Sequence, residues 1–213
     1  MEHDVSTMVY QLQNIMTTYI KEWLPIPNVK NIEYFSDGCA GQYKNKSNFF
    51  NLCKHEVDFG LKANWTFFAT SHGKSPCDGI GGTVKRITAK VSLQRPLNDQ
   101  ILDCGKMFEF CENGIHFPNI KFFFVSAEQM KDLRSWLKKE RFDGLTSIPG
   151  TRSYHQFQLL NDFKLGTKRS SEQENFSYIY SFSNDITKFN GNPSDTIKPS
   201  SYVACVVTCK MPI

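Results

Sequence analysis

The sequence has no long apolar run, no internal repeat and no strong excess of either charge. No stretch approaches the ~18 consecutive apolar residues of a membrane-spanning helix, and the N-terminal run from Val5 to Ile20 is broken by Gln, Asn and Thr. We therefore expect neither a signal peptide nor a membrane anchor. The 25 basic and 21 acidic residues leave a formal net charge of +4, which suits a polyanionic partner without requiring one.

The 213 residues are enough for a domain with a substantial hydrophobic core. Hydrophobic residues make up 40% of the chain and aromatic residues 14%, which excludes a disordered tail or a low-complexity linker. The seven cysteines cannot all pair, because their number is odd. Without a secretory signal, this count indicates free thiols in a reducing compartment. We therefore expect an intracellular protein.

Alternating patterns near the start of the chain predict an α/β domain. Apolar residues spaced three and four apart indicate a helix from Val5 to Trp23. Val29 to Phe35 is typical of a buried strand, and the pattern from Gln42 to Phe59 is helical. Ala63 to Thr70 is rich in aromatic residues and predicts a second strand. A helix between two strands indicates a βαβ unit.

Three further helices and one further strand are expected before residue 149. The helices cover Ser75 to Val91, Asn98 to Cys111 and Ala127 to Glu140. The strand is the strongly apolar segment from Lys121 to Ser126. We assign residues 1–149 to this α/β core.

Residues 150–213 are expected to form an irregular extension of strands and loops. Ser, Asn, Thr and Lys dominate from Gly166 to Ser201, and the helical periodicity is lost. Short apolar segments remain at Tyr154 to Leu160 and at Tyr202 to Val207.

Two aspartates occupy positions where acidic side chains could meet. Asp37 follows the first strand, in a turn with Gly38, and Asp78 lies in the first turn of the helix that begins near Ser75. In an α/β sheet the C-terminal ends of strands and the N-termini of the following helices face the same edge. Converging carboxylates with Lys and Arg nearby suit Mg²⁺ or Mn²⁺ held against a phosphate.

Polar and basic residues cluster in the sequence around the same strand ends. They are Gln42, Lys44, Asn45, His72, Lys74, Lys85 and Arg86. In a nucleic-acid-binding protein these residues would contact phosphates. In the alternative interpretation they are solvated side chains on exposed helix faces, and His72 is a surface or capping histidine.

The segments that carry these residues resemble the RNase H-like core of DDE-type transposases and integrases, especially an animal group of such sequences. The first segment is S-D-G-C-A-G-Q-Y-K-N at 36–45, and the second is H-G-K-S-P-C-D-G-I-G-G-T-V-K-R at 72–86. The similarity covers roughly the first half of the chain, as a partial core in the order helix–strand–helix–strand–helix. The C-terminal segment from Ser201 to Val206 also resembles the first strand of a small β-barrel appended in that group.

This resemblance implies a two-metal site for DNA cleavage and strand transfer. Two divalent ions ~4 Å apart would activate water or a DNA 3′-hydroxyl and stabilise the leaving oxygen. Asp37 would match the second acid of the catalytic triad and Asp78 the third. DNA is then the expected partner, and the nucleus the expected location.

The sequence departs from that family at its N-terminal end. An RNase H-like domain begins with a β-hairpin and a third strand, and the first of these strands carries the first catalytic acid. This sequence begins at the helix that normally follows them, and no acidic residue before Asp37 ends a convincing strand. We therefore expect a truncated transposase-derived protein without catalytic activity of its own. Its exposed sheet edge would need a partner chain, a second copy or another cover.

Each aspartate also has a structural interpretation. Asp78 follows Ser75 by three residues, as in a capping box, and Asp37–Gly38 is a common turn pair. If both roles are structural, the protein is a non-catalytic module that binds nucleic acid or protein. A nuclease that takes its missing acid from a partner chain is a third hypothesis.

Overall fold

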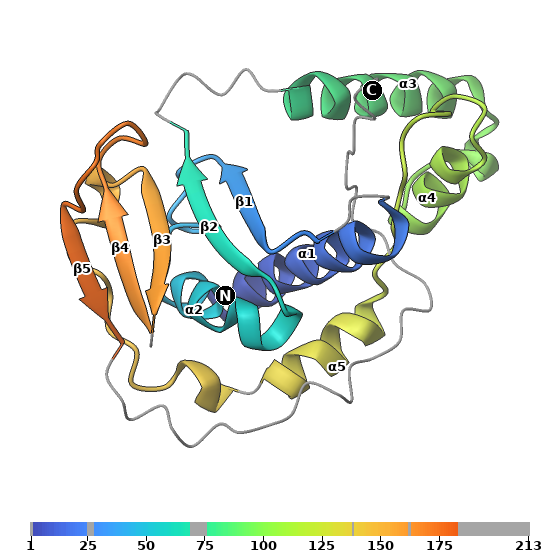
Figure 1. Cartoon of the computed structure of the whole chain (residues 1–213). Coiled ribbons are helices and arrows are strands. Elements are labelled where there is room, and N and C mark those ends of the chain that lie inside the picture. Colours follow the sequence, from blue (N-terminus) through green and yellow to red (C-terminus); the bar gives the residue numbers. More distant parts are fainter. Residues whose placement is uncertain (1, 25–27, 69–75, 138, 162, 183–213) are drawn as a thin grey trace. The chain divides into compact units, whose positions relative to one another are not determined.

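Five α-helices and a five-stranded mixed sheet make up the regular structure of the residues that are described, as drawn in Figure 1. The computed structural model describes residues 2–24, 28–68, 76–137, 139–161 and 163–182. The chain forms two compact units, Met1–His72 with Met130–Ile197 and Gly73–Gln129 with Lys198–Ile213. The predicted α/β class is therefore confirmed.

The first unit contains a parallel strand–helix–strand arrangement. Its elements are β1 (Asn31–Ser36), α2 (Lys46–Phe59) and β2 (Lys62–Phe67), and α1 (Glu2–Trp23) precedes them. The two strands pair in parallel, from Asn31 opposite Lys62 to Ser36 opposite Phe67. The predicted βαβ unit is confirmed. Helix α2 begins after its N-cap, Asn45, and ends at Gly60, whose φ of 66° favours glycine.

Three antiparallel strands extend this sheet from β2. They are β3 (Gln156–Asn161), β4 (Lys164–Lys168) and β5 (Tyr178–Ser181), and the strand order is β1-β2-β3-β4-β5. The C-terminal part of the chain was expected to supply strands, but its pairing with β2 was not predicted. Among the described residues, β1 pairs only with β2, so its other edge is open. The segments 201–206 and 202–207 lie outside the described residues.

The core of the first unit lies between α2 and one face of the sheet. Phe49 and Phe50 of α2 are buried, together with Trp65 and Phe67 of β2 and Phe157 of β3. The Phe49 and Phe157 rings stack with their centres 4.1 Å apart. The buried residues of β2 alternate with less buried ones, as expected for a strand with one covered face. Helix α2 contacts both β2 and α1 (Figure 1).

The second unit has its own hydrophobic cluster. It contains α3 (Pro76–Gln94), a 3₁₀ turn (Leu97–Asp99) and α4 (Cys104–Glu112), and α5 (Ala127–Leu137) begins at its end. Val84 of α3 and Phe110 of α4 are buried with Phe117 and Phe122. None of the helices among the described residues is long and apolar enough to cross a membrane.

Two predictions for this part of the chain are wrong. The segment from Lys121 to Ser126 forms no strand, because Phe122 is buried by packing against the hydrophobic cluster and not by strand pairing. The helix expected from Asn98 to Cys111 is divided: α4 begins only after Asp103, whose carboxylate accepts the backbone N–H of Lys106 at 2.8 Å. A side-chain cap thus sets the start of this helix.

Candidate functional site

Asp37 lies directly after β1, as predicted, and its side chain is exposed. Its Oδ1 accepts the backbone N–H of Cys39 at 2.9 Å, which makes a side-chain turn. The Cys39 carbonyl oxygen then accepts backbone N–H groups from Gln42, Tyr43 and Lys44. The carboxylate of Asp37 therefore helps to fold the loop that joins β1 to α2. Its other oxygen, Oδ2, has no hydrogen-bond partner among the described residues.

Lys44 closes the same loop from the inside. Its side chain is only 8% exposed, and its Nζ donates to the carbonyl oxygen of Tyr154 at 2.7 Å. The Nζ also lies 5.0 Å from the centre of the Phe67 ring. Burial lowers the pKa of the Lys44 ammonium group. Lys44 thus ties the loop after β1 to the segment before β3, and a role in binding nucleic acid stays a prediction for this residue.

Asn45 is also held by the fold. Its Oδ1 accepts the backbone N–H of Asn48 at 3.0 Å, the N-cap contact of α2, and also accepts the hydroxyl of Ser6 from α1 at 3.3 Å. The Gln42 carbonyl oxygen accepts the side-chain amides of Asn45 and Asn48 at 3.3 and 2.7 Å. The Gln42 side chain itself is exposed. Of these neighbours, Gln42 is the one that presents its side chain to solvent.

The remaining predicted site residues are divided between the second unit and the undescribed segment. Asp78, Lys85 and Arg86 lie on α3 and are exposed, with Asp78 in the first turn as predicted. His72 and Lys74 lie outside the described residues. Asp37 belongs to the first compact unit and Asp78 to the second, so their convergence stays a prediction. Within the described part of the chain, no three His, Cys, Asp or Glu side chains form a group that could hold a metal ion.

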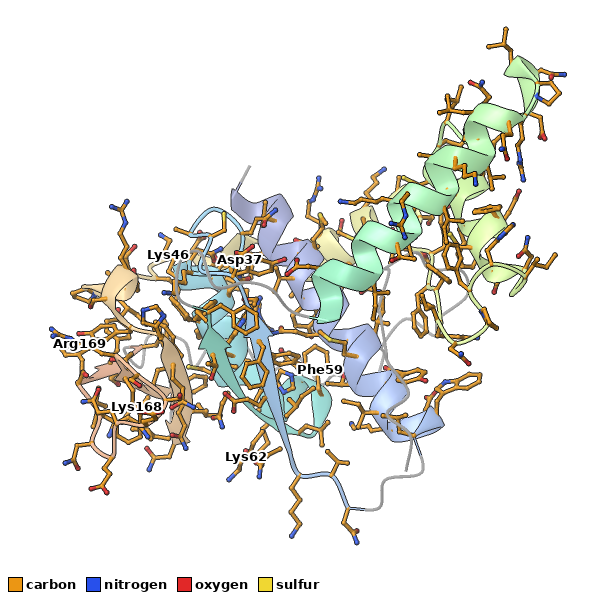
Figure 2. The ribbon with its side chains drawn as sticks, turned by 90° about the horizontal axis from the view of Figure 1, so that it is seen from above. Asp37, Lys46, Phe59, Lys62, Lys168 and Arg169 are labelled. Atoms are coloured by element: carbon orange, nitrogen blue, oxygen red, sulfur yellow. The ribbon has the colours of Figure 1, made fainter. Side chains whose placement is uncertain are left out.

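Lys46 is the first residue of α2, and Figure 2 labels it together with Asp37. The Nζ of Lys46 donates to the carbonyl oxygen of Leu145 at 3.0 Å. Lys44 and Lys46 therefore both bind backbone carbonyl groups from the region between α5 and β3. These two contacts fix the end of the sheet at which Asp37 stands.

Two buried polar clusters were not predicted. In the first, His55 of α2 lies between the Tyr34 hydroxyl and the carbonyl oxygen of Leu61, and it is completely buried. In the second, the guanidinium of Arg141 makes an ion pair with Asp58 and donates to Asn51 at 3.1 Å. Sequence patterns report where apolar residues repeat, so they carry no direct signal for such pairs.

A family model with the description "Domain of unknown function (DUF8701)" matches residues 1–171. The matched range contains both aspartates and all the predicted nucleic-acid-binding residues. No curated protein and no solved structure matches the chain.

Proposed function

The chain belongs to the DUF8701 family, and from its own residues we propose that it is a transposase-derived protein that binds DNA on an RNase H-like core. The ancestral activity in this proposal is divalent-metal-dependent DNA cleavage and strand transfer. This chain keeps the binding without catalysing cleavage by itself. A DNA partner gives a nuclear location as part of the same proposal.

The hydrogen bond between Asp37 and Cys39 is the observation that best supports a DNA-binding protein without cleavage activity. Asp37 stands directly after β1 of a parallel βαβ unit, where the resemblance places the second acid of a DDE triad. Yet its Oδ1 accepts the N–H of Cys39, which gives the carboxylate a structural role in the turn. The buried Lys44 and the capping Asn45 support the same interpretation, since both are engaged within the fold.

Metal-dependent cleavage is the second candidate, and the Oδ2 atom of Asp37 favours it. This oxygen belongs to an exposed side chain and is not used by a hydrogen bond among the described residues. Carboxylate oxygens are the ligands that Mg²⁺ and Mn²⁺ prefer. Asp37 and Asp78 would hold the ion, which would supply charge stabilisation at a phosphate. The open edge of β1 could accept a strand from a partner chain or a second copy.

The two candidate functions predict different results when DNA cleavage and DNA binding are measured on the same protein. Supercoiled plasmid is incubated with the protein and Mn²⁺, alongside the variants Asp37→Asn and Asp78→Asn. The proposal expects no nicking or strand transfer, together with DNA binding that weakens as salt increases. Manganese-dependent nicking that both substitutions abolish would establish the second candidate instead. A DNA affinity that does not respond to salt would overturn both.

A further inference from the structure

The sheet has a second face, opposite the one that α2 covers. Strand pairing places side chains of this face in rows that cross the sheet. One row contains Phe35, Thr66, Gln156 and Lys168, from four successive strands. We call this face the open face. Its members are Phe35, Phe68 and the polar residues Glu33, Lys62, Asn64, Thr66, Gln156, Gln158, Lys164 and Lys168.

An exposed aromatic pair lies at one side of the open face. Phe35 of β1 is 60% exposed, and its ring stacks on that of Phe68 with the centres 6.2 Å apart and the planes at 21°. Neighbouring apolar side chains that are exposed together mark an interaction site more often than a single exposed apolar residue does. Phe35 thus offers a flat apolar surface that is already held in place by Phe68.

Lysines outnumber acidic residues on the open face, although the exposed carboxylate of Asp37 follows Phe35 by two residues. Lys62 and Lys164 of the open face are exposed, and Lys168 is half-buried with its Nζ 5.2 Å from the centre of the Phe176 ring, which covers this face at Gly166. The acid among the strand residues of this face, Glu33, accepts the hydroxyl of Thr66 at 2.6 Å. Between them lie Asn64, Gln156 and Gln158, whose neutral polar side chains are half-buried. Because adjacent strands are ~4.8 Å apart, Lys168 lies three strand spacings, or ~14 Å, from Phe35. Figure 2 labels Lys62 and Lys168 on their strands.

We propose that the open face binds single-stranded DNA, with a base stacked on Phe35 and the flanking phosphates near Lys62 and Lys168. This inference rests on the proposed function, because it assigns a place and a strand form to the DNA. Aromatic rings that stack bases beside cationic side chains are a general means of binding single strands. In a duplex each base is already stacked between its neighbours, so no base has a free face on which the Phe35 ring could stack. The ring pair therefore favours a single strand over a duplex.

The test compares Phe35 variants of the full chain on two labelled DNAs. Binding of a ten-nucleotide oligo-dT and of a ten-base-pair duplex is measured by fluorescence anisotropy between 50 and 200 mM salt. Phe35→Ala should weaken oligo-dT binding about tenfold, the range expected for one stacked base. Phe35→Trp should retain the affinity. Trp23→Ala, which removes an aromatic residue that is 62% exposed on α1, is the matched control and should change nothing.

The lysines are tested in the same titrations. Lys62→Gln and Lys168→Gln should each lower the slope of log affinity against log salt by about 0.7 for a single strand. Lys131→Gln, which removes an exposed charge from α5, is the control. Equal affinity of wild type and Phe35→Ala for oligo-dT would overturn the inference, as would preference for the duplex, and both results would leave the proposed function standing.

Three other outcomes are distinct. Binding of neither DNA would overturn the inference and the proposed function together. Tighter binding of oligo-U than of oligo-dT would replace DNA by RNA as the ligand. Loss of self-association in Phe35→Ala, seen by sedimentation without an effect on oligo-dT, would assign the open face to a second copy of the chain and overturn the inference.

Discussion

Tyr34 and His55 are joined by a hydrogen bond of 2.7 Å between the phenol oxygen and Nε2 in the interior of the first unit. The Nδ1 atom of His55 lies 2.6 Å from the carbonyl oxygen of Leu61, which can only accept. Nδ1 therefore carries the proton, and Nε2 accepts the hydroxyl hydrogen of Tyr34. The imidazole thus joins β1, α2 and the start of β2 while remaining neutral.

Replacing Tyr34 by Phe should destabilise the protein. The substitution leaves Nε2 of the buried His55 without a donor, at a cost of about 1–3 kcal/mol. Urea denaturation of the variant and the wild type measures this difference in the free energy of unfolding. Tyr178→Phe removes a hydroxyl that is more exposed and serves as the control. An unchanged stability of Tyr34→Phe would show that the hydrogen bond is replaced by another partner.

Stability should fall as the solution is made acidic. Burial lowers the pKa of His55 below its ordinary value of 6.5, so the unfolded chain binds a proton at higher pH than the folded chain does. The contribution is fully present above pH 6.5 and is lost as the pH falls through the lower pKa of the folded state. Denaturation between pH 7.5 and 5 measures it.

NMR titration of the imidazoles assigns this effect to one residue. His55 should keep its neutral signal below pH 6.5. A normal titration of His55 near pH 6.5 would contradict the prediction.

The ion pair between Arg141 and Asp58 should contribute strongly to stability. Their side chains are 11% and 6% exposed, so Arg141→Ala leaves a buried carboxylate without its partner, which costs about 3–5 kcal/mol. Arg95 and Asp99 form a matched pair on the surface, with side chains 32% and 63% exposed. Arg95→Ala should cost less than about 1 kcal/mol. Comparable losses in the two variants, measured by urea denaturation, would refute the distinction.

Lys44 should contribute to stability more than to DNA binding. Lys44→Ala removes a charged hydrogen bond to the Tyr154 carbonyl, worth about 1.5–3 kcal/mol. The slope of log DNA affinity against log salt should stay unchanged in the folded variant. Lys85→Ala provides the comparison, because Lys85 is exposed on α3 and its loss should reduce that slope by about 0.7 for a single strand. A reduced slope for Lys44→Ala would give that side chain a direct phosphate contact.

Local patterns predicted the elements of the βαβ unit, because each of its segments has a periodicity that matches its structure. The turn at Asp37 was one of the two interpretations of that residue, whereas the N-cap at Asn45 was not predicted. The pairing of β3 with β2 could not be predicted in this way, because it joins residues far apart in the sequence. The segment at Lys121 to Ser126 misled the prediction, since an apolar run says that residues are buried without saying how.

For the site, the sequence indicated charge but not burial. Lys44 and Asn45 stand in a run of polar residues that is typical of a surface, yet both side chains are only 8% exposed. Their burial depends on Tyr154 and Ser6, which lie in distant parts of the sequence. The exposed pair of Phe35 and Phe68 was not predicted either. Phe35 lies in an apolar strand pattern, which indicates a buried residue, whereas its side chain is exposed.

The pairing of β2 with β3 has a consequence for synthesis of the protein. Asn64 lies opposite Gln158, and residues Gly73–Gln129 of the second unit lie between them in the sequence. On the ribosome, the nascent chain therefore completes α2 and β2 long before β3 emerges to join them. During this interval Trp65 and its neighbours can gain only part of their final packing, since strand contacts over such separations form slowly. The sheet is thus finished only after residues Gly73–Gln129 have been synthesised, when β3, β4 and β5 follow.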